Sequence, residues 1–226
     1  RNDATSSAKK VSMKSWLGMF MILLLAMTGC RKDPVKNLTA SESRIYITNH
    51  DSLAEFSSFK TFSIADSAGV IEDGRGKGME LTDYDAAVIA AIKKRMQEQG
   101  YELVMRDASP DIGITVSRVY SNYSGVISYP SYWDYYGSFY DPYYWGYGGY
   151  GYYDPVYYGP GYYEYYQVTQ GALSIDMLNL KNAKADNTIH PLWSGLARGT
   201  GVFNINNVDS QVKALFDQSP YLITNQ

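Results

Sequence analysis

The 38 residues from Tyr129 to Tyr166 restrict what this chain can fold into more than any other part of it, because they hold 17 tyrosines, seven glycines and four prolines. Prolines remove donors that a strand ladder needs, and strict alternation is lacking, so a regular strand is disfavoured. The glycine, proline and hydroxyl content also excludes a membrane span. We therefore predict a long projecting loop insert over residues 125–166, placed between two adjacent strands at 111–120 and 168–180.

A weak internal repeat runs through the insert at a spacing of 13 residues. The first copy starts at Asp141-Pro142 and the second at Asp154-Pro155, and Asp-Pro pairs favour turns. Tyrosines and glycines recur in register behind both pairs. Two copies are too few for a solenoid, because about three or more repeats are needed to bury a shared core.

Tyrosine gives the insert the chemistry of a contact surface, since each ring offers a large apolar area, few rotatable bonds and one polar group. Tyrosine with glycine and serine is also typical of antibody contact loops. The insert is thus a candidate surface for a glycan, a partner protein or self-association. A low-complexity loop without a specific ligand explains the same composition. The candidate binding residues are Tyr144, Trp145, Tyr150, Tyr157 and Tyr163.

Residues 1–29 are typical of a secretory signal peptide, with Met13 as the expected translation start. Lys14 supplies a positive charge before a 12-residue apolar run from Trp16 to Met27. A helix that spans a bilayer needs about 20 apolar residues, so a transmembrane segment is disfavoured. A buried helix of a folded domain is disfavoured as well, because no charged residue gives the run a solvated face.

The end of this signal, Met27-Thr28-Gly29-Cys30, resembles the lipobox of bacterial lipoproteins. The resemblance implies that Cys30 becomes the mature N-terminus, with a diacylglyceryl group on its sulfur and a further acyl chain, such as palmitate, on its amine. Cys30 is also the only cysteine, so an intramolecular disulfide is impossible and lipidation would remove an exposed thiol. An ordinary buried cysteine is the alternative.

These features predict a lipid-anchored protein of the bacterial cell envelope that faces the periplasm, in the outer membrane rather than the inner one. Two or more acyl chains give stable anchoring, and residues 30–43 would be the lipidated cysteine and its tether. The mature chain would carry 16 basic and 22 acidic residues, a net charge of −6. This charge does not match the basic surface of a nucleic-acid-binding protein, so no nucleic-acid partner is expected.

Residues 44–226 are expected to form a single α+β domain interrupted by the insert. Residues 83–99 have helical spacing with a cap at Thr82, and Asn207 can cap a closing helix. We predict a largely antiparallel sheet with two helices packed on one face. The candidate strands are 43–48, 59–64, 101–105, 111–120, 168–180 and 189–197. The expected core contains Ile92, Ile112, Ile114, Leu173, Ile175 and Trp193.

Five short segments, taken in order, are similar to domain-of-unknown-function family 4136, a group of bacterial envelope lipoproteins. The resemblance extends from about Arg44 to Tyr221 and is interrupted by the insert. It implies an α+β domain and an envelope location, without an established activity. The segments are Phe59-Lys60-Thr61-Phe62, Gln99-Gly100-Tyr101, Pro110-Asp111-Ile112-Gly113-Ile114, Gly171-Ala172-Leu173-Ser174-Ile175-Asp176 and Leu192-Trp193-Ser194-Gly195-Leu196-Ala197.

Side chains suited to catalysis or metal binding are few in this sequence. The two histidines, His50 and His190, are expected to be partly exposed polar residues beside strands. Asp83 and Asp85 lie in a first helical turn, where acidic residues complement the helix dipole. The run 74–78 lacks the spacing of a phosphate-binding loop and is expected to be a flexible connection.

We therefore expect a structural or binding protein with no catalytic residues, no cofactor and no metal. The alternative is a hydrolase or another enzyme that acts on envelope polymers. An enzyme would need titratable side chains that converge in a pocket, whereas a binding protein needs only an exposed aromatic surface.

Overall fold

The computed structural model describes residue 39 and residues 43–72, 75–120, 124–128, 144–147, 151–152, 163–167 and 171–224. The chain divides into two compact units, residues 1–38 and 39–226, and every described residue belongs to the second. The signal peptide and Cys30 lie outside the described residues, so their roles stay predictions.

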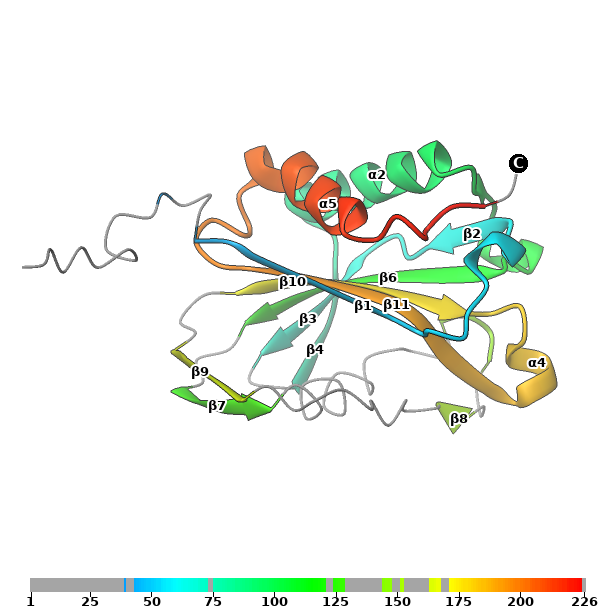
Figure 1. Cartoon of the computed structure of the whole chain (residues 1–226), viewed down its shortest axis with the longest axis horizontal. Coiled ribbons are helices and arrows are strands. Elements are labelled where there is room, and N and C mark those ends of the chain that lie inside the picture. Colours follow the sequence, from blue (N-terminus) through cyan, green and yellow to red (C-terminus); the bar gives the residue numbers. More distant parts are fainter. Residues whose placement is uncertain are drawn as a thin grey trace, which may run out of the picture. The chain divides into compact units, whose positions relative to one another are not determined.

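A nine-stranded sheet forms the centre of the second unit (Figure 1). Its strands are β1 Ile45–His50, β2 Thr61–Ile64, β3 Ala68–Glu72, β4 Arg75–Glu80, β5 Glu102–Leu103, β6 Ile112–Tyr120, β8 Gly151–Tyr152, β10 Ala172–Asn179 and β11 Thr188–Arg198. The main path runs β1-β11-β10-β6-β2-β5, and β3 pairs with both β6 and β4.

The longest pairings, β6 with β10 and β10 with β11, are antiparallel, as is β1 with β11. The prediction of a largely antiparallel sheet is therefore confirmed. β2 and β3 pair with β6 in parallel over shorter stretches. The described elements also include a separate two-stranded sheet of β7 (Ser124–Ser128) and β9 (Tyr163–Gln167).

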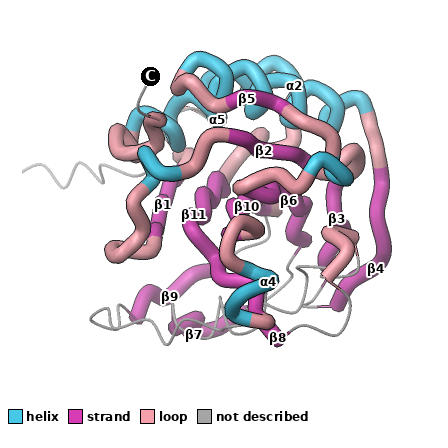
Figure 2. The backbone as a smooth tube through the Cα atoms, turned by 90° about the vertical axis from the view of Figure 1, so that its right-hand side faces the viewer, coloured by secondary structure: helices cyan, strands magenta, loops and turns pink. Residues whose placement is uncertain are grey.

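Two helices, α2 (Asp83–Glu98) and α5 (Val208–Asp217), lie side by side on one face of the large sheet, as predicted (Figures 1 and 2). The hydroxyl of Thr82 accepts from the backbone N–H of Asp85, whose carboxylate accepts from the N–H of Thr82. This reciprocal cap satisfies two donors at the start of α2. The short helical turns are η1 Phe56–Ser58, η2 Arg106–Ala108, α4 Ala183–Asp186 and η4 Ile205–Asn207.

The predicted cap of α5 is wrong in its detail. Asn207 occupies the residue before the helix, but its side chain makes no capping hydrogen bond. Its Nδ2 instead donates to the carbonyl oxygen of Gly201 at 2.9 Å. The Asn207 side chain therefore stabilises the loop before α5, and not the first turn of the helix as predicted.

Alternation along the central strands forms the main core. In β6 the even-numbered residues from Ile112 to Val116 belong to this core, and so do the odd-numbered residues of β10 from Leu173 to Met177. All six predicted core residues lie in this one buried cluster with the apolar faces of α2 and α5. Trp193 is almost fully buried, and its Nε1 donates to Ser219 Oγ at 2.8 Å, which satisfies its one polar atom.

The prediction of a flexible connection over residues 74–78 is wrong, because β4 runs through most of this segment. β4 pairs with β3, whose buried Ala68 and Ile71 place that hairpin against the rest of the sheet. The ladder shifts register opposite Ile71, and Gly78 adopts a φ of +115°. Glycine adopts this conformation without steric cost, so the glycines of the run allow a bulged strand rather than a loose loop.

The insert joins β6 and β10, which are adjacent as predicted. The prediction that it contains no regular strand is wrong, because β7 pairs with β9 and β8 pairs with β11. The four prolines lie outside these strands, so each strand keeps its ladder donors. β7, β8 and β9 lie on the opposite side of the sheet from α2 and α5 (Figures 1 and 2).

Replacing Ile114 with alanine should lower the free energy of unfolding by about 2–5 kcal/mol, because the change leaves a cavity in a fully buried position. Chemical denaturation of the variant and the parent measures this difference. Lys94→Ala, on the exposed side of α2, is the control and should change stability by less than about 0.5 kcal/mol. Equal small effects of both changes would contradict the assigned core.

Candidate functional site

The turn Tyr144–Tyr147 attaches the insert to the domain. Trp145 is 5 % exposed and Tyr147 is 8 % exposed, and both belong to a second apolar cluster. The hydroxyl of Tyr147 donates to the carbonyl oxygen of Leu180 at 3.2 Å. Gly146 has a φ of +78°, which glycine adopts readily. We call this second apolar cluster the docking cluster. Its other buried members are Leu178 of β10, Leu180 between β10 and α4, Ala183 of α4 and Ile189 of β11.

Gly113 in β6 leaves the space that Trp145 occupies. A Cβ atom at Gly113 would lie 2.8 Å from Leu180 Cδ1 and 2.9 Å from Trp145 Cε2. Neither distance is compatible with the present packing, so the absent side chain is what lets the indole ring approach the strand. A glycine inside a strand often marks such a close approach.

The Tyr144 side chain connects the same turn to two other segments, which contain Arg106 and Asp66. Its ring meets Trp145 edge-on, with ring centroids 5.0 Å apart, and the guanidinium of Arg106 lies 4.5 Å from the Tyr144 ring centroid. The backbone N–H of Asp66 points to the Tyr144 hydroxyl at 3.4 Å. A cation over an aromatic face contributes about 0.5–1 kcal/mol at an exposed site, so Tyr144 adds to the attachment.

A second attachment follows a few residues later along the chain. Gly151 and Tyr152 of β8 pair in parallel with Thr188 and Ile189 of β11. Ile189 also belongs to the docking cluster, so the buried turn and β8 reach the same corner of the sheet. The middle of the insert is therefore held on the domain, and the expectation that the whole insert projects is wrong for residues 144–147.

The structure places two of the five predicted binding residues in the docked turn. Trp145 and Tyr144 hold the insert on the domain, and Trp145 offers almost no exposed area. Tyr150 and Tyr157 lie outside the described residues, and Tyr163 belongs to β9 by its backbone. Sequence reasoning missed the buried role of Tyr147, although Gly113 inside a predicted strand was a signal that another segment approaches there.

The sheet face opposite α2 and α5 carries a buried polar group. Asp176 of β10 lies between Ser194 of β11 and Thr115 of β6 in the strand register. The Oγ atom of Ser174 donates to Asp176 Oδ2 at 2.9 Å. Asp176, Ser174 and Ser194 are all buried, so this polar surface is not open to solvent.

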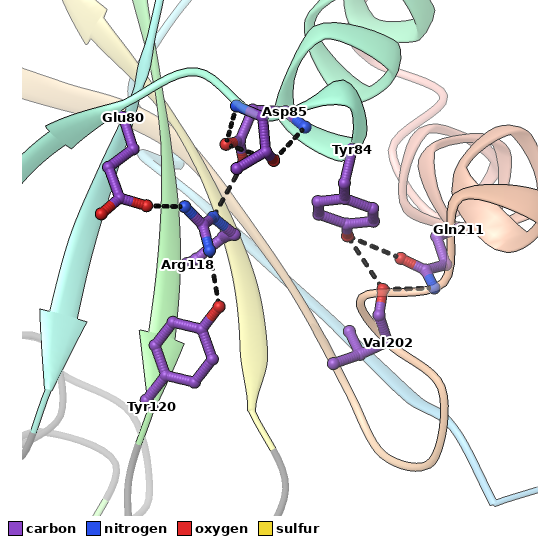
Figure 3. A network of polar contacts seen from close by, with 8 residues as sticks. Glu80, Tyr84, Asp85, Arg118, Tyr120, Val202 and Gln211 are labelled. Carbon is purple, nitrogen blue, oxygen red and sulfur yellow. Dashed lines mark hydrogen bonds and ion pairs between the residues drawn. The ribbon is translucent and has the colours of Figure 1, made fainter.

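Arg118 of β6 is at the centre of a second polar network (Figure 3). Its Nε lies 2.9 Å from Asp85 Oδ1, one terminal nitrogen donates to Glu80 at 2.5 Å and the other to the Tyr120 hydroxyl at 2.6 Å. Asp85 is 0 % exposed, so the prediction that this acid only complements the helix dipole is wrong. Asp85 both caps α2 and neutralises a nearly buried arginine.

Burial and neighbouring charges shift the pKa values of Arg118 and Tyr84. Burial by itself would lower the pKa of Arg118, but the hydrogen bond to Glu80 and the charge of Asp85 raise it above its ordinary value. Burial, reinforced by Asp85, also raises the pKa of Tyr84 well above its usual range. The neutral Tyr84 hydroxyl donates to the carbonyl oxygen of Val202 at 2.9 Å. The network thus joins β4, β6 and α2, and Tyr84 extends the contact of α2 to the loop before α5.

Both histidines lie in strands, His50 in β1 and His190 in β11. His50 is exposed and stacks on Tyr221, with ring centroids 4.0 Å apart. His190 is partly exposed, and its Nε2 lies 3.5 Å from Asp186 Oδ2. Within the described ranges, histidine, cysteine, aspartate and glutamate form no group of three that could hold a metal ion. None of the helices in those ranges combines the length and the apolar character required to span a membrane.

The fold and its docked insert define an α+β domain with a mixed sheet, helices on one face and a long aromatic connection between two central strands. The chain belongs to DUF4136, a domain of unknown function, whose family model matches residues 47–221. This finding confirms the family resemblance of the sequence. None of the curated proteins matches the chain.

A solved structure of the same family agrees with this assignment. A crystal structure of a DUF4136 family protein from Bacteroides thetaiotaomicron has 28 % identity and a TM-score of 0.63, over 81 % of this chain and 99 % of that chain. The PelC dodecamer from Paraburkholderia phytofirmans has 10 % identity and a TM-score of 0.38, over 81 % and 99 % of the two chains. A PDZ domain protein from Parabacteroides distasonis has 12 % identity and a TM-score of 0.39, over 79 % and 36 %.

Gly113→Ala should release the turn Tyr144–Tyr147, because the added methyl group occupies the place of the Trp145 ring. Overpacking of this kind costs about 1–3 kcal/mol. Hydrogen exchange should become faster at residues 144–147 and 151–152, and the unfolding midpoint should fall. Gly69→Ala is a matched control in another strand, where the closest atom is a serine hydroxyl at 3.2 Å.

Combining Gly113→Ala with Trp145→Ala distinguishes this packing from a general loss of stability. The second change removes the ring that the new methyl group meets, so the double variant should be more stable than the sum of the two single effects predicts. Additive losses would show that Gly113 and Trp145 are not coupled.

Proposed function

We propose that this protein is a lipid-anchored component of the bacterial cell envelope that binds an envelope glycan or protein through its tyrosine-rich insert. Cys30 would carry the lipid, and the domain would face the periplasm from the outer membrane. The role is structural or binding rather than catalytic. Membership of the DUF4136 family is compatible with this proposal and assigns no activity by itself.

The observation that carries the proposal is how the insert is attached. Residues 144–147 and 151–152 hold its middle against the docking cluster and β11. The tyrosine-rich runs 129–143 and 153–162 lie on either side of this attachment in the sequence. Attachment of residues 144–147 and 151–152 fixes the positions from which both runs start, and this lowers the entropy that a partner must overcome on binding.

The contact surface is tested by replacing residues 129–143 and 153–162 with glycine-serine linkers of the same lengths, while residues 144–152 are kept. Folding should be preserved, since the docking cluster stays complete, and capture of envelope material from detergent extracts should be lost. A variant that also lacks residues 144–152 should be less stable, because Leu178, Leu180 and Ile189 lose their cover. Capture that survives the linker replacement would contradict the proposed contact surface.

The anchor is tested by Cys30→Ala in the full chain. Without the thiol no diacylglyceryl group can be attached, so the protein should leave the membrane fraction or accumulate as an uncleaved precursor. Membrane fractionation and mass measurement of the purified chain distinguish these outcomes from wild-type behaviour. Normal processing and normal fractionation of Cys30→Ala would contradict the lipid anchor.

A further inference from the structure

β5 ends the main path of the large sheet and lies beside β2 (Figure 2). The backbone N–H groups of Glu102 and Val104 donate to carbonyl oxygens in and just before β2, both at 2.9 Å. Alternate residues of an extended segment direct their N–H groups to opposite edges, so those of Leu103 and Met105 point away from β2. Leu103 is 37 % exposed and Met105 is 78 % exposed. The outer edge of β5 therefore combines backbone donors with exposed apolar side chains.

Two other edge strands of the large sheet differ from β5. On β1, the Asn49 side chain accepts from the N–H of His50 at 2.8 Å, and Gln218 Nε2 donates to the carbonyl oxygen of Tyr46 at 3.5 Å. β4 carries Lys77, and its ladder with β3 shifts register. A lysine and a bulge on an edge strand discourage the addition of another strand. β5 and the three residues that follow it contain neither lysine nor proline.

The order of residues 102–106, Glu-Leu-Val-Met-Arg, is complementary to itself in an antiparallel pair. When Val104 lies opposite Val104 of a second copy, Leu103 faces Met105 and Glu102 faces Arg106. Opposite charges and apolar side chains at facing positions both stabilise an antiparallel pair. Leu103 and Met105 are also the residues whose N–H groups point outward, so they can exchange the two hydrogen bonds of a facing pair.

The Arg106 side chain is positioned for the ionic part of this pairing. Its guanidinium lies over the Tyr144 ring, 4.5 Å from the ring centroid, and both Arg106 and Glu102 are exposed. An aromatic ring contacts the face of a guanidinium, whereas a carboxylate binds the N–H groups at its edge, so the two contacts are compatible. Tyr144 therefore supports Arg106 where Glu102 of a second copy would lie.

We propose that two copies of this protein associate through residues 102–106, with their β5 edges paired antiparallel about a two-fold axis. Each contact then occurs twice, because such an interface uses the same patch on both copies. Five residues per copy bury less than the roughly 1,200–2,000 Å² of a stable interface, so the dimer is weak and depends on concentration. The inference is independent of the proposed function, because it assigns no contact to residues 129–143 or 153–162.

Sedimentation velocity of the full chain in detergent, over a series of protein concentrations, measures the association. A monomer–dimer equilibrium is the expected result. Met105→Pro removes the outward N–H and should raise the dissociation constant by about tenfold or more. Met105 has a φ of −68° and a ψ of 154°, which proline adopts, so the fold should be retained. The unfolding midpoint of the variant checks this.

The register is tested by exchanging charges. Glu102→Arg and Arg106→Glu each place like charges opposite one another and should each weaken self-association by about tenfold. The double variant restores opposite charges and should recover an affinity within about threefold of the parent. An equal mixture of the two single variants should form a heterodimer, because both facing pairs are then complementary. Asp209→Arg makes the same charge change at an exposed residue of α5 and should leave the affinity within about twofold.

Four results would overturn the inference. The first is a chain that stays monomeric at every concentration, which would leave the proposed function in place. The second is a dimer that Met105→Pro and the charge variants leave unchanged, since its interface would lie elsewhere. The third is equal weakening by Asp209→Arg, or no recovery in the double variant, since either would show a general charge effect. The fourth is a monomer that takes up another polypeptide from envelope extract and loses it in Met105→Pro, since that polypeptide would be the occupant of the edge.

Discussion

The antiparallel pairing of β6 with β10 is the interaction on which the rest of this structure depends. The two strands pair over eight residue pairs, although the whole insert separates them in the sequence. Closing so long a loop costs only slightly more entropy than closing one of moderate length, because the cost rises with the logarithm of its length. Burial of apolar side chains on both faces of each strand offsets this entropy cost.

β6 contributes to packing on both faces of the sheet. Its even-numbered residues from Ile112 to Val116 join the core under α2 and α5. On the other face Gly113 has no side chain, and Trp145 of the insert takes that space. The same strand then carries Arg118, whose guanidinium contacts the buried carboxylate of Asp85 in α2 and the exposed carboxylate of Glu80 in β4. The insert is thus connected to the main core through the strand from which it leaves.

Local patterns predicted a large part of this fold. Helical spacing and the pair Thr82 and Asp85 predicted α2 almost to the residue, since caps and periodicity act within a few residues of the chain. Helical spacing for Ile92 and the patterns of the strands for the others placed all six expected core residues correctly, for the same reason. β4 was missed because its glycines carry no alternating pattern. β7 and β9 were missed because the composition of the whole insert obscured two short runs that contain no proline.

The candidate site was predictable only in its composition. The sequence by itself determined that an aromatic, glycine-rich segment without basic residues stands between two adjacent strands, and that a single α+β core surrounds it. Only the tertiary structure decided that Trp145 and Tyr147 are buried while other tyrosines remain as candidates for contact. The physical reason is that burial depends on partners distant in sequence, Gly113 and Ile189 among them, and a tyrosine-rich run carries no local signal of which ring will meet them.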